Sequence, residues 1–113
     1  MNFLWVFLGG GAGSVLRYGA AQLPLPCPTL CVNVAGCFLI GLFHGWSARW
    51  GWGEEVRLLL TTGLCGGFTT FSTFGAESLA LLRAGRPLAA AGYVGASVLL
   101  GLLATCAGAW LAR

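Results

Sequence analysis

Charged residues are scarce in this 113-residue chain, which contains neither lysine nor aspartate. Six arginines and three glutamates make up 8% of it, whereas a soluble domain carries roughly 25% charged residues because its surface faces water. Hydrophobic residues reach 58%, and the mean hydropathy is +0.84. The surface is therefore expected to face lipid, which excludes an ordinary soluble protein.

Cysteine pairs and catalytic motifs are also missing. The five cysteines include no C-x-x-C pair, and we expect them to act as small hydrophobes without disulfide or metal roles (Cys27, Cys31, Cys37, Cys65 and Cys106). The N-terminus lacks the basic region of a signal peptide, and Arg17 interrupts its apolar run. No nucleophile–base set, metal cluster or phosphate loop has supporting spacing, so we do not expect an enzyme.

Four apolar runs fill nearly the whole chain. A membrane-spanning helix needs about 20 mainly apolar residues, and the runs cover residues 3–21, 29–48, 55–82 and 88–111. Their continuous hydrophobicity excludes the alternating polarity of a transmembrane β-barrel. The sequence therefore predicts a single all-α transmembrane domain, residues 1–113, with four membrane-spanning helices and no soluble domain.

Small residues recur at four-residue spacing in three of these runs. The pairs are Gly9 and Gly13, Gly41 and Gly45, and Gly63 and Gly67. Such spacing lets helix backbones approach closely in lipid, where apolar burial cannot drive association. It predicts tight helix packing and no particular function.

The centre of the third run is rich in glycine and hydroxyl groups. Gly66 and Gly67 weaken a helix there, and four hydroxyls follow them (Thr69, Thr70, Ser72 and Thr73). Broken helices at membrane depth occur only where protein or water surrounds them, and their carbonyls bind ions in transporters. A break near residues 66–70 with an ion site is favoured; the alternative is a packed Gly-Gly contact with threonines bonded to their own helix.

Two phenylalanines follow this segment at a spacing of three. Phe71 and Phe74 therefore share a helix face, near Thr70, Thr73 and Glu77. Because aromatic rings have a positive edge, such rings can approach an anion without presenting a full charge. Lipid contact or core packing is the alternative for both.

Other polar residues interrupt the apolar runs. Asn33 is either an amide donor to an anion or an interhelical hydrogen bond, and Arg17 and Glu77 are either functional intramembrane charges or interfacial side chains. His44 is interpreted as interfacial. A polar stripe on the fourth run faces a partner helix or a hydrated pore (Tyr93, Ser97, Gly101 and Thr105).

The arginines are evenly divided between the two predicted sides of the membrane. Arg49, Arg57 and Arg113 lie on one side, and Arg17, Arg83 and Arg86 lie on the other. Orientation follows an excess of Lys and Arg on one side. Insertion both ways up and pairing with an inverted copy are therefore one interpretation, and a chance tie is the other.

Three motifs closely resemble those of the Fluc-type (CrcB family) fluoride channels. They are Gly10–Gly13 leading to Arg17-Tyr18, residues 29–36 around Asn33, and residues 63–74. The resemblance spans all four runs in order. It implies an antiparallel, dual-topology homodimer with a broken third helix and two pores, in the cell inner (plasma) membrane. Through these pores fluoride would leave the cytoplasm by passive flow.

The resemblance also implies roles for individual residues. The fluoride pore would be lined by Asn33, Phe71, Phe74, Thr70, Ser72, Thr73, Tyr93 and Ser97. Arg17 would lie at a vestibule and Glu77 in a polar track, while the backbone carbonyls of Gly66 and Thr69 would bind a structural sodium ion at the dimer centre. Gly101 departs from the family, in which a hydroxyl is common at this position.

Two other classes of membrane protein have four spans or a comparable size. A small proton-coupled multidrug exporter needs a carboxylate in the middle of its first span, and the only acids here are Glu54, Glu55 and Glu77. A membrane assembly factor without transport would tolerate loss of Asn33 or Phe71 with no change in ion flux.

Overall fold

The computed structural model describes residues 1–113, all of whose regular elements are helical. Three long helices correspond to the first, second and fourth apolar runs: α1 (Asn2–Ala21), α2 (Pro28–Trp50) and α6 (Pro87–Leu111). The third run is divided into α3 (Glu54–Arg57), the π-helix η1 (Leu58–Cys65), α4 (Gly66–Phe68) and α5 (Phe71–Arg83). The all-α prediction is confirmed, with the first, second and fourth ranges differing by only one or two residues at their ends.

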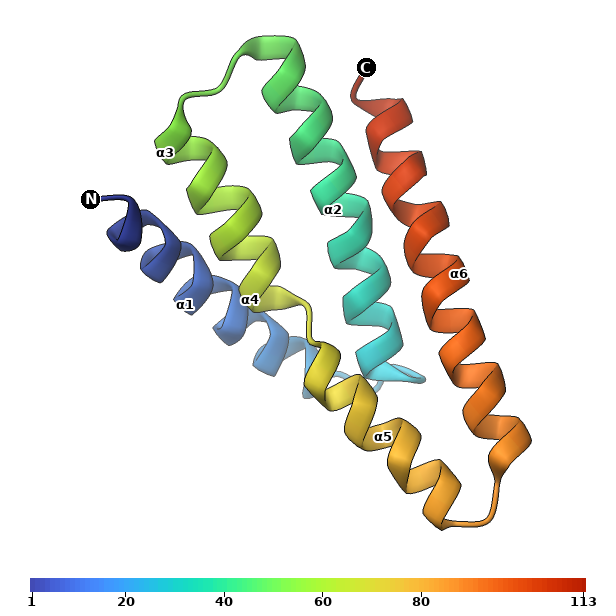
Figure 1. Cartoon of the computed structure of the whole chain (residues 1–113). Coiled ribbons are helices and arrows are strands. Elements are labelled where there is room, and N and C mark those ends of the chain that lie inside the picture. Colours follow the sequence, from blue (N-terminus) through green and yellow to red (C-terminus); the bar gives the residue numbers. More distant parts are fainter.

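The helices form an elongated bundle of 49 × 28 × 22 Å. Both chain ends and the connection from α2 to α3 lie at one end of it, while the connection from α5 to α6 lies at the other (Figure 1). By length and composition, α2 and α6 are apolar enough to cross a membrane, with mean hydropathies of 1.5 and 1.9. Helix α1 contains Arg17 and several glycines, and the third run is divided into shorter helices.

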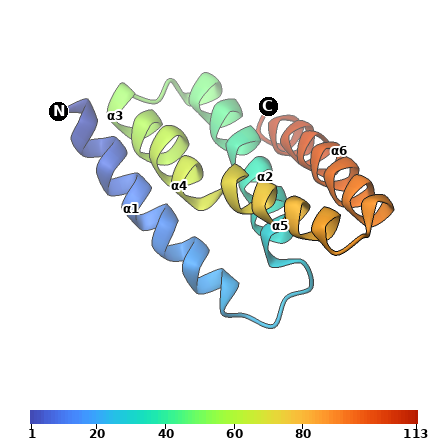
Figure 2. The same ribbon diagram turned by 60° about the horizontal axis from the view of Figure 1, so that its bottom comes forward.

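Glycines let α1 pack closely against η1 and α4, an arrangement visible in both views (Figure 1, Figure 2). A methyl group on Gly9 would overlap the carbonyl oxygen of Leu59, and one on Gly13 would overlap that of Leu64. From the other side, a methyl group on Gly63 would come within 2.9 Å of the Gly9 Cα atom. The close packing predicted from four-residue spacing is confirmed for this pair of helices.

A second glycine contact joins α2 to α6. A methyl group on Gly41 would overlap the carbonyl oxygen of Thr105, and one on Gly108 would overlap that of Phe38. Gly45 belongs to the same contact, since a methyl group added there would lie 2.6 Å from the Ala112 Cβ atom. The bundle thus consists of two helix pairs, each closely packed through glycines. Helix α5 reaches from one pair to the other.

Two residues of extended backbone separate α4 from α5. Thr69 has φ −87° and ψ 157°, and Thr70 has φ −147° and ψ 121°. Gly66 and Gly67 are themselves helical, so the glycine pair is not where the helix ends. The reason is packing: a methyl group on Gly67 would overlap the Gly10 carbonyl, so this glycine serves close approach within the helix.

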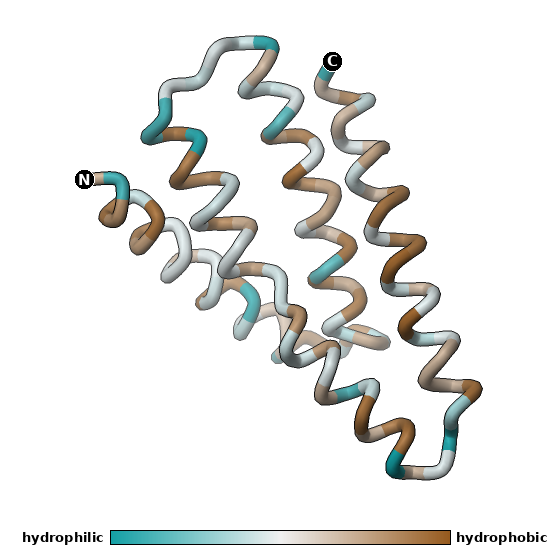
Figure 3. Tube along the Cα trace, in the orientation of Figure 1, coloured by the Kyte–Doolittle hydropathy of each residue, from teal (hydrophilic) through white to brown (hydrophobic).

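Large apolar side chains cover the outside of the bundle. Only 13 of 113 residues are buried, and exposed side chains include Phe3 at 91% and Leu88 at 87%. Hydrophobic residues run along the lengths of the helices, whereas the hydrophilic ones gather largely towards the ends (Figure 3). A surface of this kind requires lipid or another chain to cover it.

Tryptophan and arginine gather at the end of the bundle that carries the termini. Trp46 and Trp50 stack with ring centroids 5.6 Å apart, and Arg49 lies over the Trp50 ring at 5.8 Å. Arg113 lies over Trp110 at 5.5 Å. Aromatic rings beside arginines are typical of a membrane–water interface.

Candidate functional site

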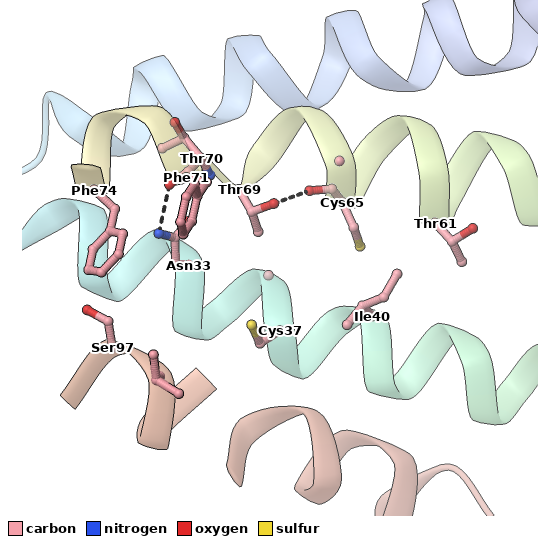
Figure 4. A pocket seen from close by; sticks show the side chains of 13 residues that line it. Asn33, Cys37, Ile40, Thr61, Cys65, Thr69, Thr70, Phe71, Phe74 and Ser97 are labelled. Atoms are coloured by element: carbon pink, nitrogen blue, oxygen red, sulfur yellow. Dashed lines mark hydrogen bonds between the residues drawn. The ribbon is translucent and has the colours of Figure 1, made fainter. Parts of the chain in front are cut away.

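A groove of about 410 Å³ lies between α2, the third run and α6. Its lining combines hydroxyl groups, an amide, two thiols and aromatic rings (Figure 4). The lining residues are Asn33, Gly36, Cys37, Ile40, Thr61, Cys65, Gly66, Thr69, Thr70, Phe71, Phe74, Ser97 and Val98. No ionisable carboxylate or guanidinium is among them, so the groove is mainly apolar, with a few polar groups and no full charge.

Asn33 holds the extended backbone of Thr70 against α2. Its Nδ2 donates to the Thr70 carbonyl at 3.0 Å, and its Oδ1 accepts from the Thr70 N–H at 2.8 Å. Both polar groups of one peptide residue are thereby satisfied where the helix cannot satisfy them (Figure 4). The interhelical hydrogen bond is the confirmed interpretation of Asn33, although one N–H of its amide is left over.

Other side chains satisfy the neighbouring backbone groups. The Thr70 hydroxyl accepts from the Thr73 N–H at 3.2 Å and so caps α5. Arg17 Nε donates to the Gly67 carbonyl at 3.1 Å, which binds α1 to the end of α4. Thr69 donates back to the Cys65 carbonyl at 2.9 Å.

Two carbonyls at this point lack the donors of an uninterrupted helix. The Thr70 N–H, which would donate to Gly66, donates to Asn33 instead. The Thr73 N–H, which would donate to Thr69, donates to the Thr70 hydroxyl. The carbonyl oxygens of Gly66 and Thr69 are therefore available to a hard cation, which prefers oxygen ligands.

Phe71 and Phe74 lie beside each other on α5, with ring centroids 5.6 Å apart and planes tilted by 47°. Phe74 also meets Tyr93 of α6 at 5.3 Å. Phe71 is 83% exposed although it lines the groove. The two rings thus form one wall of the groove, and that wall is open on the side of Phe71.

Glu77 ties three helices together beyond the groove. Its Oε1 accepts from the Tyr93 hydroxyl at 2.6 Å, and its Oε2 accepts from the Thr29 hydroxyl at 3.0 Å. Thr29 is on α2, Glu77 on α5 and Tyr93 on α6. Glu77 is half-buried. Removing a carboxylate from water is costly unless it is hydrogen-bonded, and here both oxygens have donors.

The residues of the polar stripe on α6 have different surroundings: one lines the groove, and another bonds to its own helix. The Ser97 hydroxyl oxygen is buried, lines the groove and has no hydrogen-bond partner. The Thr105 hydroxyl donates to the Gly101 carbonyl at 3.0 Å. A methyl group on Gly101 would lie 3.4 Å from the Cys37 sulfur, so the absence of a side chain there leaves room for that thiol.

Five of the eight predicted pore residues lie together in the groove: Asn33, Thr70, Phe71, Phe74 and Ser97. Ser72, Thr73 and Tyr93 lie outside its lining, although Thr73 and Ser72 bond to the Thr70 hydroxyl. Gly66 and Thr69, predicted as sodium ligands, also line it. Arg17 and Glu77 are not lining residues.

Several lining residues had no predicted role at the ion site, namely Cys37, Ile40, Thr61, Cys65 and Val98. Cys37 follows Asn33 by four residues, so helical spacing alone would have put it on the same face. The same spacing links Thr61 to Cys65. The missing information was which face of each helix meets the groove.

The CrcB family, described as "CrcB-like protein, Camphor Resistance (CrcB)", matches residues 4–109. A protein of Phocaeicola vulgatus named "Fluoride-specific ion channel FluC" is 45% identical, over 99% of this chain and 98% of the relative. Proteins of the same name from Hyphomonas neptunium and Chloroflexus aurantiacus are each 48% identical, over 99% of this chain and 95% of the relative. The chain belongs to the CrcB family.

Proposed function

We propose that this chain is a subunit of a fluoride-selective channel, through which fluoride leaves the cytoplasm down its electrochemical gradient. One observation carries the proposal: a groove with polar groups but no full charge, walled by Phe71 and Phe74, in a chain whose relatives are named fluoride-specific channels. Such a protein is a channel and no enzyme. It would lower intracellular fluoride and with it fluoride toxicity.

The chemistry of the groove suits a small, strongly hydrated anion. A pore that passes such an ion must replace its water with donors and polarised edges. The positive edges of Phe71 and Phe74, the unpartnered Ser97 hydroxyl and the remaining Asn33 N–H are such groups. None of them carries a full charge, so an anion would be bound weakly enough to leave. Ser72, Thr73 and Tyr93 would extend this path beyond the groove, with Glu77 in the polar track and Arg17 at a vestibule.

The working unit we propose is an antiparallel pair of chains, each with four membrane-spanning helices and a broken third helix, in the inner (plasma) membrane. Phe71 is 83% exposed beside the groove, so a second chain could close the open wall. The equal number of arginines on the two predicted sides of the membrane supports insertion in both orientations. A pair of inverted copies has a two-fold axis in the membrane plane, like the inverted repeats of transporters, and would contain two pores.

We further propose a structural sodium ion at the centre of this pair. The residues fit it, because the Gly66 and Thr69 carbonyls lack their helical donors. Carbonyls from both copies would together supply the oxygen ligands. Replacing sodium by N-methylglucamine should shift the purified protein from dimer to monomer at low concentration, as measured by cross-linking in detergent; an unchanged dimer fraction would contradict the sodium site.

Fluoride efflux from reconstituted vesicles tests the channel itself. Phe71→Ala and Ser97→Ala should slow fluoride release strongly, because each removes a group that faces the ion. Phe7→Ala is the matched control, since Phe7 is 75% exposed on α1 and lies outside the groove. Release no faster than from protein-free vesicles would refute transport and favour an assembly role; equal loss in the control would refute the assigned pore.

A further inference from the structure

A second groove, of about 360 Å³, opens at the end of the bundle that carries both termini. Its lining residues come from α2 and from the α3–η1 segment. Its lining is Ile40, His44, Arg57, Leu58, Thr61 and Thr62. Ile40 and Thr61 also line the first groove, so the two grooves adjoin, and we call the pair the track.

The second groove differs from the first in its charge. Arg57 is always protonated, and His44 can gain a proton, whereas no acidic residue lines the groove. The Thr61 hydroxyl is engaged, because it donates to the Arg57 carbonyl. Thr62 is exposed and supplies a further hydroxyl. A cationic groove at the end of the track thus adjoins the uncharged first groove.

The other charged groups at this end are directed elsewhere or lie outside the lining. Glu54 of α3 accepts from Asn2 of α1 at 3.4 Å. Arg49 of α2 donates to the carbonyl of Arg113, beyond the end of α6, at 3.0 Å. Glu55 and the Met1 amino group are also at this end and do not line the groove. His44 is therefore the one lining side chain that exists in both a neutral and a cationic form.

We propose that Arg57, His44 and Thr62 form a binding site for a small inorganic anion at the mouth of the track, and that protonation of His44 strengthens it. The proposal rests on the proposed channel function only in naming fluoride as the ion that passes onward. Lowering the pH adds a positive charge at His44, which attracts the anion. A single charge about 4 Å away in a watery site changes anion occupancy about fivefold.

Initial fluoride efflux rates at subsaturating fluoride measure this effect, with leakage from protein-free vesicles subtracted. The wild-type rate should rise about fivefold between about pH 8 and pH 6. His44→Gln should stay at the rate seen at high pH. Arg57→Gln should be about fivefold slower at both pH values and keep the pH dependence. Arg49→Gln, a change of the same kind outside the groove, should behave as wild type.

A measurement without flux separates this site from the channel function. His44 is the only histidine, so its imidazole gives a single set of nuclear magnetic resonance signals in detergent micelles. Because coupling is reciprocal, saturating fluoride in place of gluconate should raise the midpoint of its titration by about 0.7 pH unit. Arg57→Gln should keep that shift but need about fivefold more fluoride to reach it.

The outcomes are distinguishable. A shifted midpoint without fluoride flux would refute the channel and leave the anion site standing. Selective fluoride flux that does not depend on pH, together with an unshifted midpoint of the His44 titration, would overturn the anion site. It would leave the channel function standing. A pH dependence that persists in His44→Gln would also overturn the anion site.

Discussion

Replacing Asn33 by alanine removes the clamp on the extended backbone between α4 and α5. Two hydrogen bonds are lost, of 3.0 and 2.8 Å, and both polar groups of the Thr70 peptide lose their partners. A buried backbone group left unpaired costs about 1–3 kcal/mol. Because the site is only partly buried, we expect a loss of about 2–4 kcal/mol in the free energy of unfolding.

The assay is denaturant unfolding in detergent micelles, followed by tryptophan fluorescence at a fixed protein concentration. Cys37→Ala is the matched control, because Cys37 lies one turn along the same helix and lines the same groove. We expect it to cost far less than Asn33→Ala. If Asn33→Ala lost no more free energy than this control while abolishing fluoride flux, Asn33 would be a direct donor to the ion and no backbone clamp.

Further predictions concern packing and the carboxylate link. Gly13→Ala should destabilise the protein by about 1–3 kcal/mol through overpacking. Gly11→Ala should not, because a methyl group there meets nothing within 4 Å. Equal melting temperatures of the two variants would contradict the close packing of α1 through Gly13. Glu77→Gln and Tyr93→Phe should each lower the unfolding free energy, and their double mutant should reveal a coupling of about 1.5–3 kcal/mol for the 2.6 Å bond. Additive effects would show that this bond contributes little.

The helices could be predicted from the sequence because their signals are local. Apolar runs of spanning length and prolines at 28 and 87 mark where long helices begin. The glycine spacing predicted close packing, but spacing alone cannot say which helix is the partner. That Gly13 meets Leu64, whereas Gly41 meets Thr105, depends on tertiary arrangement.

The exact course of the third run could not be predicted for the same reason. Gly66 and Gly67 have low helix propensity, yet both are helical, and α1 packs closely against Gly67. The extended residues come later, at Thr69 and Thr70, where Asn33 from another helix supplies the hydrogen bonds. Long-range partners outweighed local propensity at this point.

The composition of the groove was largely predictable, whereas its extent was not. Asn33, Phe71 and Phe74 stand out because polar and aromatic residues are unusual within an apolar run. Cys37 and Thr61 resemble ordinary small helix residues, and only the meeting of α2 with η1 brings them into the lining. Tyr93, predicted in the pore, lies outside the groove lining and donates to Glu77.

The central claim is that the paired chains conduct fluoride selectively. The most direct test is the ratio of fluoride to chloride released from vesicles that contain the wild-type protein and both anions. We expect nearly all the fluoride to leave while the chloride stays inside, because the groove offers ring edges and hydroxyls but no full charge. Equal release of the two anions would contradict the account.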